Sequence, residues 1–348
     1  MTEGRVVTLV ATYIVVAVLL VGGTALLGLA VGGTVGTPDG VGIEGQSPAQ
    51  FQPDRVNPEV DPETGRIAVE RGDARILVDA DHGNQFEESD LEPAVEAAFR
   101  AGHTVTFSDA VDSDQQYNQT LAGRSGLLVV QPTEGFSAGE RAVIRNFTAE
   151  GGHVVVFAEP TQSRVSTGLF GGGATTVSFG ANNLTESYGV RIGAEPLFNV
   201  EDSANDNNFK SIYSSPRGDD PLTEGAETVT FDAGGYVVVR RTSDAEVVYQ
   251  SVPGTRTLDS RRAGQYPTVA RTENLVFVAD TTLLERSEVY DADNEVFVGN
   301  LLSFLVSGDA PERLPGATET DGDGGGTNDG PTGNGTVTPT NETPTPST

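Results

Sequence analysis

The sequence predicts an α/β domain, a mostly parallel sheet with helices on both faces, preceded by one transmembrane helix. Short runs that are apolar throughout, such as RILVDA (75–80) and HVVVFAEP (153–160), alternate with segments whose apolar residues recur at helical spacing. Strands of a parallel sheet are covered on both faces, which makes them continuously apolar. The transmembrane helix is predicted from an uncharged stretch near the N-terminus.

This stretch, residues 6–31, contains no charged residue. At ~1.5 Å per residue it spans ~39 Å, more than the ~30 Å hydrocarbon core of a bilayer. A secretory signal peptide has a shorter apolar run, so we expect a retained anchor. Arg5 lies in the short segment 1–5 before the span, and Asp39 and Glu44 follow it. The positive-inside rule therefore predicts a single-pass protein of the cell membrane whose C-terminal domain is extracytoplasmic.

Two segments flank the predicted domain at residues 73–308. Residues 32–72 are rich in Gly and Pro and lack periodicity, which is typical of a flexible linker. Residues 309–348 consist mainly of Gly, Thr, Asp, Asn and Pro and cannot bury a core, so we expect a disordered tail.

The first half of the domain follows a strand–helix alternation. Ser89 or Asp90 can cap a helix that ends at Gly102, and Ser137 can cap one that ends at Gly151. The strands expected around these helices are RILVDA (75–80), HTVTFSD (103–109), GLLVVQP (126–132) and HVVVFAEP (153–160).

The second half has a weaker pattern. Residues 184–188 resemble a short helix, and the polar residues 199–220 an irregular loop. A final buried strand at 274–280 and an amphipathic helix at 294–306 complete the domain. Antiparallel strands at the sheet edge are predicted for TVTF (228–231), YVVVRR (236–241), EVVYQS (246–251) and PTVAR (267–271).

Composition restricts the possible partners. Acidic residues outnumber basic ones 50 to 21, the formal net charge is −29, and Lys210 is the single lysine. This charge repels nucleic acid and anionic lipid, so we expect no nucleic-acid partner. At ~1 M salt the Debye length is only ~3 Å, and such an acidic surface suits a halophilic protein. The absence of cysteine excludes disulfides, thiolate zinc sites and a cysteine nucleophile.

Polar side chains follow the predicted strands where ligands bind in α/β sheets, at the carboxyl ends. We expect them to form an acidic crevice that binds a ligand or partner. The predicted ligand-binding residues are Asp81, His82, Asn84, Gln131, Glu134, Glu159 and Asp280.

The segment DHGN (81–84) allows three interpretations: a turn that ends a strand, a binding loop, or a catalytic loop. His82 beside Asp79, Asp81 or Glu87 could act as a general base, which makes His82 and Asp81 the catalytic candidates. Nothing nearby supplies an obvious nucleophile. Binding is therefore preferred to catalysis.

Neither a metal nor a cofactor is predicted. Asp81, His82 and Glu159 or Asp280 are residue types that could ligate a cation, but no spacing among them requires it. The Gly-rich segment GLFGGGATT (168–176) lacks the Gly-Lys-Ser/Thr of a phosphate-binding loop. We expect it to be a surface loop.

Several segments together resemble a known family. ILVDADHGN, LLVVQP, RNFTAEGGHVVVFAEP and VFVADTTLLERSEVYDADNEVFVGNLLSFL are similar to the domain of unknown function 4350, over residues 75–308. This family is a membrane-associated, partly haloarchaeal branch of the class I glutamine amidotransferase-like folds and resembles the GldG-like proteins. The resemblance implies a flavodoxin-like domain. Amidotransferases of this fold use a cysteine on a strand-to-helix elbow, so the cysteine-free chain is excluded from that activity.

The resemblance also suggests partners. Relatives are encoded beside MoxR-type ATPases, which implies a role in an assembly. The preferred hypothesis is a non-catalytic, membrane-anchored binding or scaffold protein that uses the strand-end crevice. The alternatives are a hydrolase that uses His82 with neighbouring carboxylates, and an accessory component of an ABC-type transport system.

Overall fold

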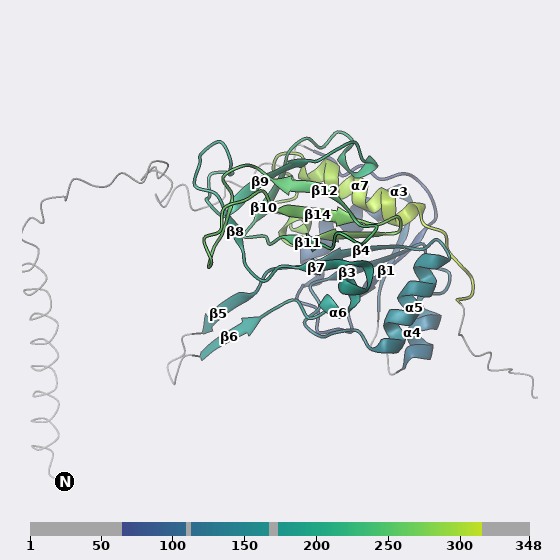
Figure 1. Ribbon diagram of the computed structural model, residues 1–348. Coiled ribbons are helices and arrows are strands. Elements are labelled where there is room, and N and C mark those ends of the chain that lie inside the picture. Colours follow the sequence, from purple (N-terminus) through teal and green to yellow (C-terminus); the bar gives the residue numbers. More distant parts are fainter. Residues whose placement is uncertain (1–64, 109–112, 167–172, 315–348) are drawn as a thin grey trace, which may run out of the picture.

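A computed structural model of the chain describes residues 65–108, 113–166 and 173–314 (Figure 1). These residues build a mixed α/β domain around one nine-stranded sheet with strand order β10-β9-β12-β14-β15-β4-β3-β1-β2. Five neighbouring strands of the sheet are parallel, and the remaining four run antiparallel.

The parallel half contains the strands that the sequence pattern predicts. Its order, β2-β1-β3-β4-β15, reverses direction between β1 and β3, and the carboxyl ends at such a reversal are the usual ligand site of a doubly wound sheet. Every residue of β3 is buried, which explains its continuously apolar sequence. The bounds are β1 Arg75–Asp79, β2 Thr104–Phe107, β3 Gly126–Val130, β4 His153–Phe157 and β15 Leu275–Val278.

The antiparallel half is larger than expected, so the prediction of a mostly parallel sheet is only partly right. Residues 199–220, predicted as an irregular loop, contain β9, which pairs with both β10 and β12. Its sequence, SIYSSP, lacks the apolar pattern of a buried strand. The sheet accommodates its serines because they form hydrogen bonds, as at Ser214, which accepts one from Thr268. The bounds are β9 Ser211–Pro216, β10 Val229–Asp232, β12 Glu246–Ser251 and β14 Pro267–Arg271.

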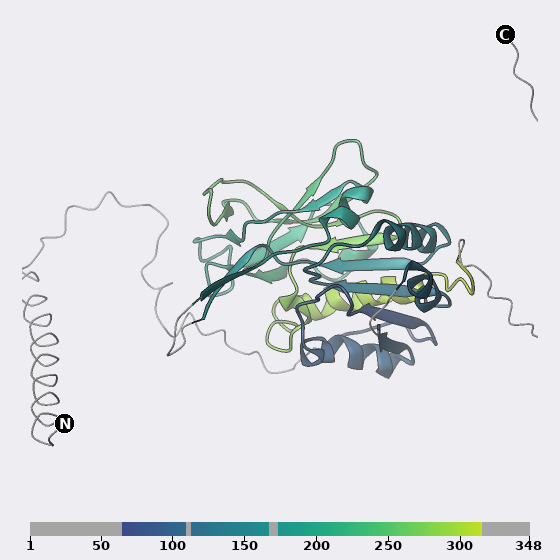
Figure 2. The same cartoon turned by 90° about the horizontal axis from the view of Figure 1, so that it is seen from below.

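Helices cover both faces of the sheet, as predicted (Figure 2). On one face, α3 (Glu92–Ala101) and α7 (Asn294–Ser307) bury the side chains of one core. On the other, α4 (Asp114–Leu121) and α5 (Ala138–Ala149) bury a second core. The sequence pattern did not predict α4, because Tyr117 and Leu121 are the only apolar side chains that DQQYNQTL buries.

Shorter elements lie beyond the sheet. The hairpin β5–β6 projects from the domain (Figure 1), so the predicted surface loop at 168–176 ends in a strand. The segment YVVVRR contributes β11, which pairs with β7 in a separate ribbon and not with the main sheet. The bounds are η2 Glu88–Leu91, β5 Gln162–Ser166, β6 Gly173–Val177, α6 Asn182–Thr185, η3 Glu186–Tyr188, β7 Val190–Ile192, β8 Leu197–Phe198, η4 Pro221–Thr223, β11 Val237–Val239, β13 Arg256–Thr257 and η5 Thr282–Leu284.

The packed part of the chain extends past the predicted domain limits of 73 and 308. Ile67 is only 6% exposed and belongs to the core beneath α7, and Leu314 is 2% exposed in the opposite core. Residues from the predicted linker and tail therefore complete the domain. The predicted anchor at 6–31 lies outside the described residues, and within the described ranges no helix is long and apolar enough to cross a membrane.

The N-terminus of α7 takes the place of a further strand beside β10. Asn294 Oδ1 accepts a 2.9 Å hydrogen bond from Thr230 N, and Asn294 Nδ2 donates to Glu288 O at 2.7 Å. Asp293 Oδ2 accepts hydrogen bonds from the backbone of Glu227 and Thr228, both at 2.9 Å. These side chains satisfy backbone groups on the unpaired edge of β10 and join the antiparallel half of the sheet to α7.

Replacing Asn294 by Ala is expected to lower the free energy of unfolding by about 2 to 3 kcal/mol, because it leaves the buried Thr230 N without an acceptor. Urea denaturation would measure this loss. Asn300→Ala is the matched control: its amide donates to Leu222 O and Glu224 O near the surface, so the loss should be below about 1 kcal/mol. Equal losses in both variants would contradict this account of the sheet edge.

Candidate functional site

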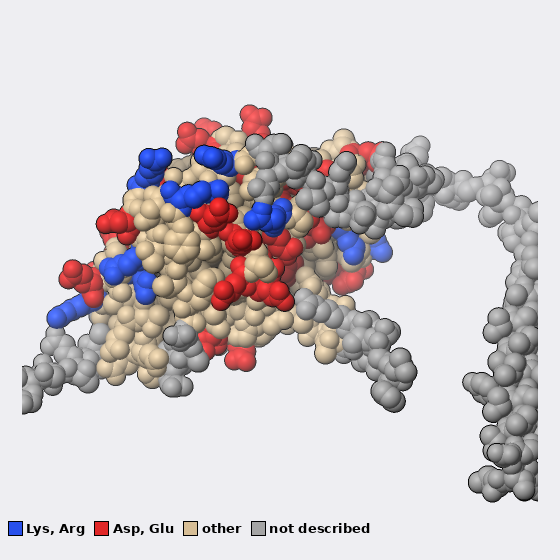
Figure 3. All heavy atoms as spheres, turned by 180° about the vertical axis from the view of Figure 1, so that it is seen from behind, with Lys and Arg blue, Asp and Glu red and all other residues tan. Residues whose placement is uncertain are grey.

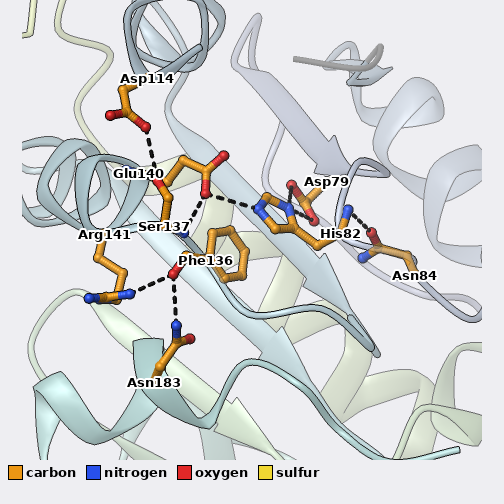
Figure 4. A network of polar contacts seen from close by, with 9 residues as sticks. All are labelled: Asp79, His82, Asn84, Asp114, Phe136, Ser137, Glu140, Arg141 and Asn183. Atoms are coloured by element: carbon orange, nitrogen blue, oxygen red, sulfur yellow. Dashed lines mark hydrogen bonds and ion pairs between the residues drawn. The ribbon is translucent and has the colours of Figure 1, made fainter. Parts of the chain in front are cut away.

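His82 is held between two carboxylates at the carboxyl end of β1 (Figure 4). Its Nδ1 lies 2.9 Å from Oδ1 and 3.0 Å from Oδ2 of Asp79, the last residue of β1. Its Nε2 lies 3.3 Å from Oε2 of Glu140, on α5. His82 is 5% exposed and Asp79 is fully buried. Both imidazole nitrogens are therefore occupied inside the protein.

Glu140 reaches this position because it belongs to the cap of α5. Ser137 is the N-cap, and its Oγ accepts a 3.1 Å hydrogen bond from Glu140 N while Glu140 Oε2 accepts one of 2.6 Å from Ser137 N. Ser137 Oγ also donates to Asp114 Oδ1 at 2.9 Å. The Ser-x-x-Glu spacing of a capping box was visible in the sequence, but it does not reveal that the glutamate contacts His82.

Asn84 fixes the loop that carries His82. Its Oδ1 accepts a 3.0 Å hydrogen bond from His82 N, and its Nδ2 donates to Val130 O at 2.8 Å. The carbonyl of His82 accepts from the backbone N–H groups of Thr133 and Glu134, both at 3.0 Å. Asn84 and His82 thus join the end of β1 to the end of β3.

Aromatic rings close the space around the imidazole. The ring of Phe136 stacks on His82 with centroids 3.8 Å apart and an interplanar angle of 25°, and the ring of Tyr117 lies edge-on at 6.1 Å. The Tyr117 hydroxyl is buried without a hydrogen-bond partner, and burial, with the negative charges of Asp79 and Glu140, raises its pKa well above 10. The reversal point between β1 and β3 is therefore filled by side chains.

Electrostatics favour the charged imidazole. Burial lowers the pKa of His82, but its hydrogen bonds to Asp79 and Glu140 and their negative charges outweigh burial, so the pKa is raised above 6.5. Burial opposes ionisation of Glu140, yet hydrogen bonds from Ser137 N and His82 lower its pKa overall. A protonated imidazole whose nitrogens both contact carboxylates has no lone pair available for general base catalysis.

A second cluster lies at the ends of β3, β4 and β15. Gln131, with a φ of 39°, follows β3, and its Oε1 accepts a 2.6 Å hydrogen bond from Glu159 N. Oε1 of Glu159 accepts from the backbone N and the Oγ1 of Thr281, at 2.6 and 2.7 Å. Oδ1 of Asp280 accepts two hydrogen bonds of 2.7 Å from Thr282. Backbone and threonine donors thus hold both carboxyl groups in place.

Burial disfavours ionisation of both carboxyl groups. Burial raises the pKa of Glu159 to about 7, despite the hydrogen bonds from Thr281 that lower it. Burial, followed by the charge of Glu159, raises the pKa of Asp280 well above 3.8. Two neighbouring buried carboxyl groups cannot both ionise readily, because their negative charges would repel each other.

Glu159 borders a pocket of about 310 Å³. The pocket lies between the base of the β5–β6 hairpin and the β7–β11 ribbon and combines polar and apolar walls. A larger, open depression of about 800 Å³ lies at the amino end of β15, away from both clusters. The smaller pocket is lined by Glu159, Thr161, Ser178, Phe179, Asn182, Arg191, Ile192, Gly193, Ala194, Tyr236 and Val238.

The predicted crevice is thus divided into two clusters. Gln131, Glu159 and Asp280 lie together as expected, whereas His82 and Asn84 belong to the cluster above β1. Glu134 is exposed and Asp81 half-buried. Among the described residues, no three His, Asp or Glu side chains are arranged to hold a metal ion, so Asp81 and His82 do not converge with Glu159 or Asp280.

Sequence reasoning missed Glu140, Asn182, Arg191 and Tyr236, because they come from elements whose positions only the fold defines.

Carboxylates also cluster around Asp232, which lies near Asp280. Acidic side chains gather at the centre of the face shown in Figure 3. Burial and neighbouring carboxylates, including that of Asp232, raise the pKa of both Glu285 and Glu288. Their mutual repulsion opposes folding wherever mobile cations do not screen it.

Raising potassium chloride from a low to a molar concentration is expected to raise the melting temperature by more than about 4 °C. This shift corresponds to a gain of over about 1 kcal/mol in the free energy of unfolding. Glu288→Gln removes one repelling charge, so it should melt higher at low salt and gain less from added salt. Differential scanning calorimetry would measure both effects. A salt response that is the same in the variant would show that these carboxylates do not cause it.

The ion pairs of His82 should stabilise the fold in a defined pH range. Because its folded pKa is raised, the stabilisation is complete below about 6.5 and is lost as pH rises through the folded pKa. His82→Gln is therefore expected to cost about 1 to 3 kcal/mol near pH 6 and less near pH 9, in urea denaturation. Leu305→Ala removes buried apolar surface from α7, in the core on the opposite face of the sheet, and should cost the same at both pH values. A pH-independent loss in His82→Gln would contradict a charged imidazole.

A solved structure similar to this chain shows the fold class. The N-terminal domain of mmIFT52 is 17% identical over 68% of this chain and 99% of its own, with a TM-score of 0.52. At this identity the likeness shows a mixed α/β fold and nothing of activity. A ThuA-like protein from Bacteroides uniformis is 11% identical over 72% of this chain and 98% of its own, with a TM-score of 0.44. Neither structure is named as a glutamine amidotransferase.

Sequence comparison gives the family. No curated protein matches the chain. The family model described as a domain of unknown function, DUF4350, matches residues 89–302, which is more than half of the chain and runs from η2 through most of α7. The chain therefore belongs to the DUF4350 family.

Proposed function

We propose that the protein is a non-catalytic, membrane-anchored binding protein whose ligand occupies the pocket beside Glu159. The observation that carries the proposal is a buried, firmly held carboxyl at the wall of a pocket of about 310 Å³. The pocket lies at the carboxyl edge of the sheet, where α/β folds bind ligands. Its volume is at the lower end of the range for small-molecule sites, about 300 to 1,000 Å³.

The geometry at Gln131 supports binding over catalysis. In the amidotransferase-like folds that the sequence resembles, a cysteine occupies a strained elbow between a strand and a helix. Gln131 has a positive φ of 39° between β3 and α5, a conformation that costs about 1 to 3 kcal/mol. Its amide is buried and bonded to Glu159 N, so this elbow carries a structural side chain instead of a nucleophile.

The alternative hydrolase receives no comparable support. It requires a free nitrogen on His82, whereas both nitrogens contact carboxylates and the ring is covered by Phe136. The hydroxyl of Ser137, at the N-cap of α5, accepts a hydrogen bond from Glu140 N and donates to Asp114.

The remaining parts of the proposal concern location and partners. Residues 6–31 would anchor the chain in the cell membrane with the domain outside. A MoxR-type ATPase or components of an ABC-type transporter are the partners that the family resemblance suggests. A direct ATPase contact requires a cytoplasmic domain, so the two expectations exclude each other.

Protease treatment of intact cells would decide the side of the membrane. If the domain is extracytoplasmic, added protease should remove an epitope placed within residues 118–185 without lysis. Protection until lysis would place the domain inside the cell and favour an ATPase partner.

Ligand binding is expected to stabilise the full-length protein in detergent at high salt. A ligand at 100 times its Kd adds about 2.7 kcal/mol, so a thermal-shift screen of small polar metabolites should reveal binders. Ala194→Trp fills the pocket and should abolish the shift. Phe99→Trp adds bulk at an exposed site on α3 and should leave the shift unchanged. A shift that persists in Ala194→Trp, or no shift with any compound, would overturn the proposal.

A further inference from the structure

The pocket beside Glu159 presents opposite charges from two separate elements. Glu159 follows β4, and Arg191 is the exposed middle residue of β7; both line the same pocket. Extending the function proposed above, on which it rests, we propose that the ligand is a small zwitterion. Such a molecule combines an ammonium or quaternary ammonium group with a carboxylate, as in an α-amino acid or a betaine.

The Glu159 end is suited to an ammonium group. Its carboxyl is held by Thr281 on one oxygen and by Gln162 Nε2, at 3.3 Å, on the other, so it is placed before a ligand arrives. Asp280 lies behind it, and its carboxyl hydrogen-bonds that of Glu159, which favours the ionised form of Glu159. An anionic ligand group would be repelled here, whereas an ammonium would form a charge-assisted hydrogen bond.

The Arg191 end is suited to a carboxylate. The guanidinium is 3.7 Å from Glu186, and both side chains are exposed. Exposed pairs of this kind contribute about 0 to 1 kcal/mol, so exchanging Glu186 for a ligand carboxylate costs little. Arginine can bind a carboxylate with two parallel hydrogen bonds, which also fixes the orientation of the ligand.

The walls between the two charges suit the body of such a ligand. The Tyr236 ring lies against Gly193, where a Cβ would come within 2.5 Å of its Cζ. An aromatic face attracts ammonium and quaternary ammonium groups. Val238, opposite Arg191 in the β7–β11 register, is 47% exposed and supplies apolar surface over the pocket. A neutral polyol would use neither charge, and a simple anion or cation would use only one.

Binding should release a proton near neutral pH. The charged or titratable groups around Glu159 are Asp280 after β15, with Asp232 of β10 beside Asp280, and Arg191 and Tyr236, which line the same pocket. The pKa of Glu159 is about 7, and an ammonium beside it favours the ionised form. Affinity for a zwitterion should therefore rise as pH increases through neutrality.

The test uses the full-length protein in detergent at high salt with glycine betaine and the standard α-amino acids as probes. At least one probe should bind in isothermal titration calorimetry, more tightly at pH 8 than at pH 6. Its amine and carboxylic acid analogues, each lacking one charge, should bind about 10- to 100-fold more weakly, the value of one charge-assisted hydrogen bond.

Variants identify the two charge contacts. Glu159→Gln and Arg191→Gln should each weaken the bound probe about 10- to 100-fold, and Glu159→Gln should also remove the pH dependence. Glu186→Gln is the matched control, because it removes the present partner of Arg191 without touching the pocket, and affinity should be kept. Thermal melts show whether each variant folds. Arg191 is exposed, so Arg191→Gln still tests the proposal if Glu159→Gln fails to fold.

Three outcomes overturn the zwitterion proposal at different levels. If sorbitol or acetate stabilises the wild type but not Ala194→Trp, while no zwitterion binds, the pocket function stands and the ligand class is wrong. If a zwitterion binds equally to Ala194→Trp, its site lies elsewhere and both proposals fail. If neither the zwitterions nor any compound of the metabolite screen binds, the proposed function itself fails.

Discussion

Burial of the parallel strands on both faces governs where this domain can place its polar groups. Because β1, β3, β4 and β15 offer no solvent-exposed face, polar chemistry in this half of the domain is concentrated where the strands end. There the interior has a low dielectric constant, and each buried polar group requires a partner. The carboxyl edge therefore holds dense hydrogen-bond networks instead of an open, hydrated crevice.

The two networks solve this problem in different ways. Above β1, the buried negative charge of Asp79 is compensated by an imidazolium that also satisfies Glu140, and the result is a closed joint between β1 and α5. Above β4, no Lys, Arg or His of the described residues forms an ion pair with Glu159 or Asp280, and burial raises the pKa of both carboxyl groups. An uncompensated carboxyl at the wall of a pocket is the arrangement that a positively charged ligand group would complete.

The backbone after β3 is strained, and the side chain there has a structural role. Gln131 has a φ of 39°, and its Oε1 accepts a hydrogen bond from Glu159 N. This contact fixes the segment that carries Glu159 at the wall of the neighbouring pocket. Fold alone does not assign a function, because the chemistry depends on the few groups at the strand ends.

The five parallel strands and the helices α3, α5 and α7 can be predicted from the sequence, because burial on both faces of a strand, or on one face of a helix, leaves an apolar pattern that is local in the chain. The sequence also indicates that Gln131, Glu159 and Asp280 share an edge, since the carboxyl ends of parallel strands meet. The position of β9 in the sheet is evident only from the fold, because its polar serines find their partners on other strands. Folding also brings Glu140 to His82 and Arg191 to the pocket of Glu159, since contacts between residues distant in the chain leave no periodic pattern.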